Sequence, residues 1–198
     1  GWRCMAYDEE MEPDDGDVAE QYSAAGEESR WFYFQSNGKA VHADDEEYKR
    51  TTIDNKKYYF DENGVMASGW IAAEDDAESG DSTGISRFIY LGTENEGNMY
   101  QGTWVYLDEH PWTSDDEDAI EEGDDEECPD EGENAWYYLE NDGTPAYLKS
   151  TADSMNDATT KVGSSSYFFN EYGVMRTGLI KLSVDGKNLV GYFGDDSP

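Results

Sequence analysis

The feature that most constrains this fold is an aromatic motif that the sequence contains twice. The first copy runs WFYFQSNGKAV…KKYYFDENGVMASGWI over residues 31–71, and the second runs WYYLENDGTPAY…SSYFFNEYGVMRTGLI over residues 136–180. Matching positions stay about 102 to 109 residues apart, which predicts a tandem duplication with units 1–101 and 102–198. A copy this small and this aromatic cannot bury its own apolar face, so the two units are expected to form one continuous stack.

Both ends of the sequence also fall inside the repeat. The chain opens on Gly1-Trp2, which matches the segment 102–104, and it stops within the equivalent of LGTENEG. We therefore expect the chain to be a piece of a longer array of such units.

Each copy divides further into hairpins. An aromatic strand is followed by an Asn-Gly or Asp-Gly turn, a short apolar step, and a Gly-Trp or Gly-Leu pair that opens the next strand. Asn-Gly and Asp-Gly tolerate the positive φ angles of tight turns, and no window shows a helical apolar stripe. The sequence predicts an all-β fold with six hairpins: 2–7 with 31–34, 51–53 with 57–60, 69–73 with 87–91, 103–107 with 136–139, 159–162 with 166–169, and 179–184 with 189–193.

Aromatic side chains must supply most of the core of such a fold. They make up 14% of the residues, whereas 30% are charged. A single hairpin is marginal in water, but adjacent hairpins can share large buried areas of Trp, Tyr and Phe. A highly charged chain with few aliphatic residues would otherwise indicate disorder, and the aromatic periodicity argues against it.

The motifs WFYFQSNGKAV, KKYYFDENGVMASGW, WYYLENDG and SYFFNEYGVMRTGL resemble the cell-wall-binding repeats of Gram-positive bacteria. That family includes choline-binding modules, streptococcal glucan-binding repeats and the repetitive domains of clostridial toxins. The resemblance implies a β-solenoid in which about three hairpins complete one superhelical turn, with each copy forming roughly one turn. Long acidic loops at hairpin tips interrupt the resemblance.

The resemblance also implies where a ligand would bind. In choline-binding repeats, the quaternary ammonium group lies among a Trp of the Gly-Trp strand, a Trp of the paired strand and an aromatic residue of the following hairpin, held by cation-π attraction. Carried over residue by residue, this gives two candidate aromatic boxes: Trp2, Trp31 and Tyr59, and Trp104, Trp136 and Phe168.

The remaining interfaces depart from the family pattern. Arg87 stands where Trp70 would need an aromatic partner, Lys57 and Ser166 replace the leading Trp, and Leu179 replaces the Trp of Gly-Trp. The same aromatic residues could also be plain core between hairpins. Neutral glycans stacking on exposed rings explain them equally well.

The acidic residues concentrate in three inserts, 8–29, 74–86 and 108–134, within a chain of net charge −34. Each insert falls at a hairpin tip, so we expect long solvated loops that project outward. Calcium binding is the alternative, because hard cations favour clustered carboxylates, although the inserts lack EF-hand spacing; we therefore assign no cofactor. The charge disfavours nucleic acid as a partner.

Few residues suggest catalysis. His42 and His110 lie in no triad or metal-ligand spacing, and both are expected to be exposed loop residues. We therefore predict no enzymatic activity and no catalytic residue. Cys4 and Cys128 could form a disulfide or remain two free thiols, since two cysteines impose no framework.

These observations lead to one leading hypothesis and two alternatives. The leading hypothesis is a non-catalytic, extracellular binding module that attaches a bacterial surface or secreted protein to the cell wall. Its partner would be a choline-bearing teichoic acid or a glycan, without membrane insertion. The alternatives are a structural spacer whose acidic loops meet a basic partner, and an adhesin that binds host glycans.

Overall fold

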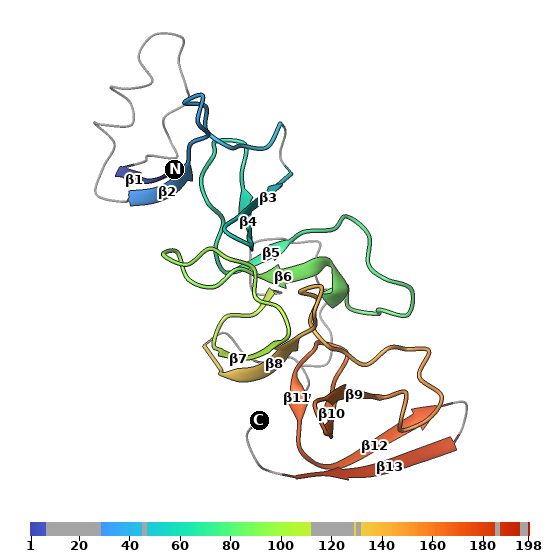
Figure 1. The fold of residues 1–198 in the computed structure, drawn as a ribbon. Helices are drawn as coiled ribbons and strands as arrows, with labels where there is room; N and C mark the ends of the chain where they lie inside the picture. The colour runs from blue at the N-terminus through green and yellow to red at the C-terminus, as the bar shows by residue number, and fades with distance from the viewer. Residues whose placement is uncertain (7–28, 45–46, 112–128, 130–131, 185–186, 195–197) are drawn as a thin grey trace. The chain divides into compact units, whose positions relative to one another are not determined.

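The computed structural model describes residues 1–6, 29–44, 47–111, 129, 132–184, 187–194 and 198 (Figure 1). These residues form strands and one short 3-10 helix, η1 (Ile85–Arg87). Among them, no helix has the length and apolar character needed to span a membrane. The strands are β1 (Trp2–Ala6), β2 (Ser29–Tyr33), β3 (Lys49–Ile53), β4 (Lys56–Phe60), β5 (Trp70–Ala72), β6 (Phe88–Tyr90), β7 (Thr103–Leu107), β8 (Ala135–Leu139), β9 (Thr159–Val162), β10 (Ser165–Phe169), β11 (Met175–Arg176), β12 (Gly178–Val184) and β13 (Lys187–Phe193).

The six predicted hairpins are confirmed, and the fold is all-β. The antiparallel pairs are β1–β2, β3–β4, β5–β6, β7–β8, β9–β10 and β12–β13, and the short strand β11 adds to β10. Most observed strand boundaries lie within one or two residues of the predicted ones, because the aromatic runs and turn residues mark both ends of each strand.

Glycine turns end the aromatic strands in the same way in both copies. The amide of Gly64 donates to the carbonyl of Asp61 over 3.1 Å, and the amide of Gly173 donates to the carbonyl of Asn170 over 3.0 Å. Both glycines have positive φ, 80° and 74°, a conformation that costs glycine little and other residues more. The amides of Gly38 and Gly143, in the predicted Asn-Gly and Asp-Gly pairs, donate to Gln35 and Glu140 in the same way, so the glycine turn is repeated, although Gly173 follows Tyr172.

The described residues divide into two compact units. The first comprises Gly1–Gly69 and Leu91–Met99, and the second comprises Trp70–Tyr90 and Tyr100–Pro198. This division differs from the sequence repeats at 101 and 102, because Trp70 and Tyr90 of the first repeat share a core with residues of β7 and β8. The two compact units therefore do not coincide with the predicted sequence repeats 1–101 and 102–198. The duplication remains a prediction.

Each unit has its own aromatic core. In the first unit, Val41, Ile53, Phe60 and Met66 form a buried cluster with Trp2, Trp31, Tyr33 and Tyr58 packed against it. In the second unit, one cluster centres on Tyr137 and Leu139, and another on Phe168 and Ala158. These cores hold the half-buried rings described next.

Candidate aromatic binding sites

Hairpin β1–β2 brings two tryptophans onto one face. Trp2 lies directly opposite Tyr33, and Trp31 lies two residues further along β2, so all three side chains share a face of the pair. The ring centroids of Trp2 and Trp31 are 6.4 Å apart with planes at 85°, and those of Trp2 and Tyr33 are 5.1 Å apart. Two planes at a right angle form a corner rather than a stack.

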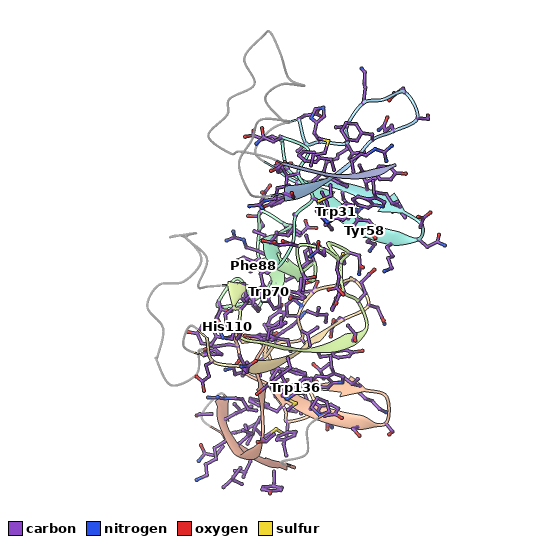
Figure 2. All side chains as sticks on the ribbon, turned by 90° about the vertical axis from the view of Figure 1, so that its left-hand side faces the viewer. Trp31, Tyr58, Trp70, Phe88, His110 and Trp136 are labelled. Carbon is purple, nitrogen blue, oxygen red and sulfur yellow. The ribbon has the colours of Figure 1, made fainter. Side chains whose placement is uncertain are left out.

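The next hairpin supplies a third wall. The ring of Tyr58 on β4 lies 4.8 Å from that of Trp2 with planes at 64°, and the fully buried Phe60 lies 5.9 Å from Trp2. Trp2, Trp31 and Tyr58 are each only partly exposed. We call these three rings cluster A; Figure 2 labels Trp31 and Tyr58.

Hairpin β7–β8 repeats this arrangement with nearly the same geometry. Trp104 lies 6.3 Å from Trp136 at 84° and 4.7 Å from Tyr167 of β10 at 68°. Phe169 lies 5.7 Å from Trp104, as Phe60 lies behind Trp2. We call Trp104, Trp136 and Tyr167 cluster B. Agreement within 0.2 Å at three ring pairs indicates one design used twice.

The third residue of each predicted box, Tyr59 or Phe168, does not lie beside the tryptophans in the structure. Tyr59 is 7% exposed, and its hydroxyl contacts the sulfur of Met99 at 3.8 Å. Phe168 is 4% exposed and packs against Phe193. Because neighbouring residues on a strand point to opposite faces, Tyr58 and Tyr167 lie beside the tryptophans, and Tyr59 and Phe168 face the other way.

The surroundings of cluster A favour a cation. Burial, with the nearby charge of Asp54, raises the pKa of Tyr58 above its usual value, so its hydroxyl stays neutral at physiological pH. The indole N–H of Trp31 donates to Asn95 over 3.2 Å, which fixes the orientation of that ring. Neutral aromatic faces near the carboxylate of Asp54 attract a cation.

Cluster B has an additional wall. Tyr106 lies directly opposite Trp136 in the strand register, and its ring lies 4.8 Å from that of Trp136 with planes at 34°. Tyr106 is largely exposed. The matching position in β1 is Cys4, whose side chain is exposed. Cluster B therefore presents more aromatic surface than cluster A.

A third set of rings surrounds Trp70, which is also partly exposed. Trp70 lies 5.3 Å from Tyr137, and its indole N–H donates to the carbonyl of Glu109 over 3.0 Å. Phe88 lies opposite Ala72 in the register and is buried. It therefore occupies the place beside Trp70 that was predicted for Arg87. Trp70 packs against the core cluster of Tyr137 and Leu139. Figure 2 labels Trp70, Phe88 and His110 at this interface.

His110 is buried, which corrects its prediction as an exposed loop residue. It is 2% exposed; its Nε2 lies 2.8 Å from the carbonyl oxygen of Glu133, and its Nδ1 lies 2.7 Å from the hydroxyl of Tyr137. A carbonyl can only accept, so Nε2 carries the proton and Nδ1 accepts from Tyr137. His110 thereby fixes the core beside Trp70. His42 is exposed, as predicted.

The acidic insert 74–86 differs in part from the expected projecting loop. Residues 74–79 are exposed, but Asp81 accepts hydrogen bonds from the amides of Thr83, Gly84 and Ser86 over 2.7–3.0 Å. Glu78 pairs with Lys149 over 2.9 Å. The second half of the insert, residues 81–86, is therefore held by hydrogen bonds and packed. The inserts 8–29 and 108–134, with Cys128, lie largely outside the described residues, so the disulfide remains open.

The described part of the chain contains no group of three or more His, Cys, Asp or Glu side chains arranged to hold a metal ion. The fold and the two clusters together define an all-β protein of aromatic hairpin repeats that carries two aromatic corners of one design.

Two segments of the chain match models of known protein repeats. Residues 50–79 match the model of the choline-binding repeat, and residues 131–144 match the model of the cell wall binding repeat. The first match contains most of β3, all of β4 and Trp70, and the second contains β8 and its glycine turn. Together they cover less than half of the chain. They confirm the predicted resemblance to the cell-wall-binding repeats over these two segments. No curated protein matches the sequence.

Several solved structures are similar at low identity. Choline binding protein F from Streptococcus pneumoniae is 22% identical with a TM-score of 0.46, over 81% of this chain and 35% of that one. The modular autolysin LytC from Streptococcus pneumoniae is 22% identical with a TM-score of 0.37, over 80% and 34%. Truncated alternansucrase from Leuconostoc mesenteroides is 20% identical with a TM-score of 0.36, over 59% and 8%. The chain thus spans about a third of the length of the two pneumococcal proteins.

Proposed function

We propose that this chain is a non-catalytic binding module that attaches a bacterial surface or secreted protein to a choline-bearing cell-wall polymer. Clusters A and B are the binding sites, and the trimethylammonium group lies against the faces of two tryptophans and one tyrosine in each. The observation that carries the proposal is the near-identical ring geometry of the two clusters. Plain core packing does not require partly exposed rings to keep the same angles in two diverged copies.

The charge of the chain supports a cationic ligand. With a net charge of −34, the molecule raises the local concentration of any cation near its surface. Each ring face adds about 0.5–2 kcal/mol of cation-π attraction, depending on desolvation. The three rings of a cluster then give a weak to moderate affinity for one choline group. Binding of one polymer at both clusters increases the overall affinity through avidity.

The arrangement of the hairpins is part of the proposal. We propose that they form one solenoid, with about three hairpins per turn, in which the inserts 8–29 and 108–134 extend as acidic loops. The offset of about 102 to 109 residues between matching aromatic positions supports this arrangement. Small-angle scattering of the whole chain tests it: a solenoid gives a rod-like profile, and a compact globule would contradict it.

A choline titration by calorimetry tests the binding sites. Tyr167→Ala should weaken choline binding at cluster B about fivefold, the equivalent of about 1 kcal/mol, whereas Tyr167→Phe keeps the ring and should change affinity less than twofold. Tyr192→Ala, at a tyrosine that is 70% exposed and outside both clusters, is the matched control and should bind like the wild type.

Two results would contradict the proposal. One is silence towards choline together with no sedimentation with choline-bearing cell walls, which would favour the spacer. The other is saturable binding of glucan oligosaccharides without choline binding, which would favour a neutral glycan as the partner.

A further inference from the structure

The second copy of the repeat contains a groove that neither aromatic cluster uses. It has a volume of about 700 Å³ and lies along β10, β11 and β12. Its rim includes Leu179, which is 60% exposed. The lining residues are Leu148, Phe168, Asn170, Met175, Arg176, Thr177, Leu179, Ile180, Lys181 and Leu182.

The strand register identifies the corresponding place in the first copy. Phe60 pairs with Met66, and Phe169 pairs with Met175 in the same way. Likewise, the amide of Ala43 donates to Asp61 and that of Leu148 donates to Asn170. Tyr59 and Met66 therefore correspond to Phe168 and Met175 of the groove.

In the first copy this place is occupied by the segment Thr93–Met99. The amide of Met99 donates to the carbonyl of Lys57 over 2.8 Å, and Asn98 forms a β-bridge with Tyr58, so the segment adds to the free edge of β4. The side chain of Met99 contacts the Tyr59 hydroxyl. Gly97 lies so close to Met66 that a Cβ atom there would be 2.3 Å from its sulfur.

The burial of matching residues differs accordingly. Met66 is only 7% exposed under Gly97, whereas Met175 is partly exposed and lines the open groove. In the second copy, β11 pairs with β10 only at Phe168 and Phe169. In the first copy, Asn98 bridges β4 at Tyr58, whose counterpart on β10 is Tyr167, the residue before Phe168. Phe168 is already covered by Phe193 and only 4% exposed, so the apolar surface that the groove leaves open is that of Met175 and Leu179.

The charges of the groove indicate what it accepts. Arg176 and Lys181 line it, at positions where the first copy has Ala67 and Ala72. The segment that occupies the first copy carries Glu94 and Glu96. Two cations gathered in one groove of a chain with net charge −34 are complementary to an acidic occupant.

We propose that this groove is a docking site for an extended acidic polypeptide segment with a Gly-Asn-Met sequence. The segment adds to the edge of β10 by backbone hydrogen bonds, and its methionine packs on Met175 and Leu179 while its carboxylates face Arg176 and Lys181. This inference concerns polypeptide recognition and does not rest on choline binding by the clusters.

The test is the binding of a labelled peptide, Thr-Glu-Asn-Glu-Gly-Asn-Met-Tyr, to the whole chain by fluorescence anisotropy. We expect saturable binding with a Kd of about 0.1–1 mM, because a short flexible peptide loses much of its gain to ordering. Lys181→Glu should weaken it at least about fivefold, since it places a like charge against the peptide. Replacing the peptide methionine by alanine should have a similar effect.

The matched control is Lys187→Glu, which makes the same charge change on the exposed Lys187 of β13, outside the groove lining; it should change Kd less than twofold. Lys181 is also exposed, so both variants should keep the wild-type circular dichroism spectrum. Absence of saturation at millimolar peptide would overturn the proposal. So would equal losses in the two variants, which would indicate non-specific charge attraction.

Discussion

Asp81 gives the sharpest test of how the acidic insert 74–86 is built. Its Oδ1 accepts from the amides of Thr83 and Gly84, and its Oδ2 accepts from both the amide and the hydroxyl of Ser86 over 2.7 and 2.6 Å. Ser86 is buried. One carboxylate therefore satisfies three backbone amides that have to be paired for the segment to pack beside η1.

The expected cost follows from these bonds. Asp81→Asn keeps an oxygen towards Thr83 and Gly84 but turns an NH2 group towards the amide of Ser86, so one buried charge-assisted bond is lost, at about 1.5–3 kcal/mol. Asp81→Ala removes all of them and should cost about 3–4 kcal/mol after allowance for partial exposure. Asp76→Asn makes the same chemical change at an exposed site of the same insert and should stay within about 0.5 kcal/mol.

Urea denaturation, followed by circular dichroism, measures the free energies of unfolding, and the m value shows whether the unfolded state has changed. Amide hydrogen exchange at Ser86 adds a local readout, because loss of its acceptor exposes that N–H. Equal stabilities for Asp81→Asn and Asp76→Asn would refute the reasoning and would mean that the whole insert behaves as a solvated loop.

Two further predictions concern the buried His110 and the partly buried Asp61. His110→Ala should lower the free energy of unfolding by about 2–4 kcal/mol, and a double-mutant cycle with Tyr137→Phe should show a coupling of about 1 kcal/mol or more; additive effects would contradict the hydrogen bond between them. Burial, opposed by the Val65 amide bond, raises the pKa of Asp61 above its usual value, so its contribution to stability is complete below the unfolded-state pKa and falls as pH rises through the raised value. Asn170, the counterpart of Asp61, accepts from the amide of Val174 just as Asp61 accepts from that of Val65. Asp61→Asn should therefore raise the free energy of unfolding at pH 7, and denaturation curves should depend less on pH above pH 4. A large loss of stability at pH 7 would contradict this.

The strands could be predicted because the sequence marks them twice, with aromatic runs and with glycine turns. The faces of the strands could not, since Tyr58, Tyr59 and Phe60 are all aromatic and no polar residue shows which way the alternation runs. The predicted boxes therefore contain Tyr59 and Phe168, whereas the residues beside the tryptophans are the preceding ones, Tyr58 and Tyr167.

Other features depended on contacts between distant segments. His110 stands beside acidic residues and Pro111, which indicate a loop, and only the Tyr137 hydroxyl and the Glu133 carbonyl explain its burial. The role of Asp81 was readable in principle, because Asp-Ser-Thr-Gly places amides two and three residues after a carboxylate, a common turn signal. Acidic composition concealed it, since one structural carboxylate looks like its solvated neighbours.

The stoichiometry of choline binding tests the central claim most directly. Clusters A and B predict two sites per chain in an isothermal titration, one site in Trp2→Ala or Trp104→Ala, and none in the double variant. Tyr106 should make cluster B the tighter site. A wild-type chain that binds a single choline, or variants that each keep two sites, would contradict the assignment of both clusters.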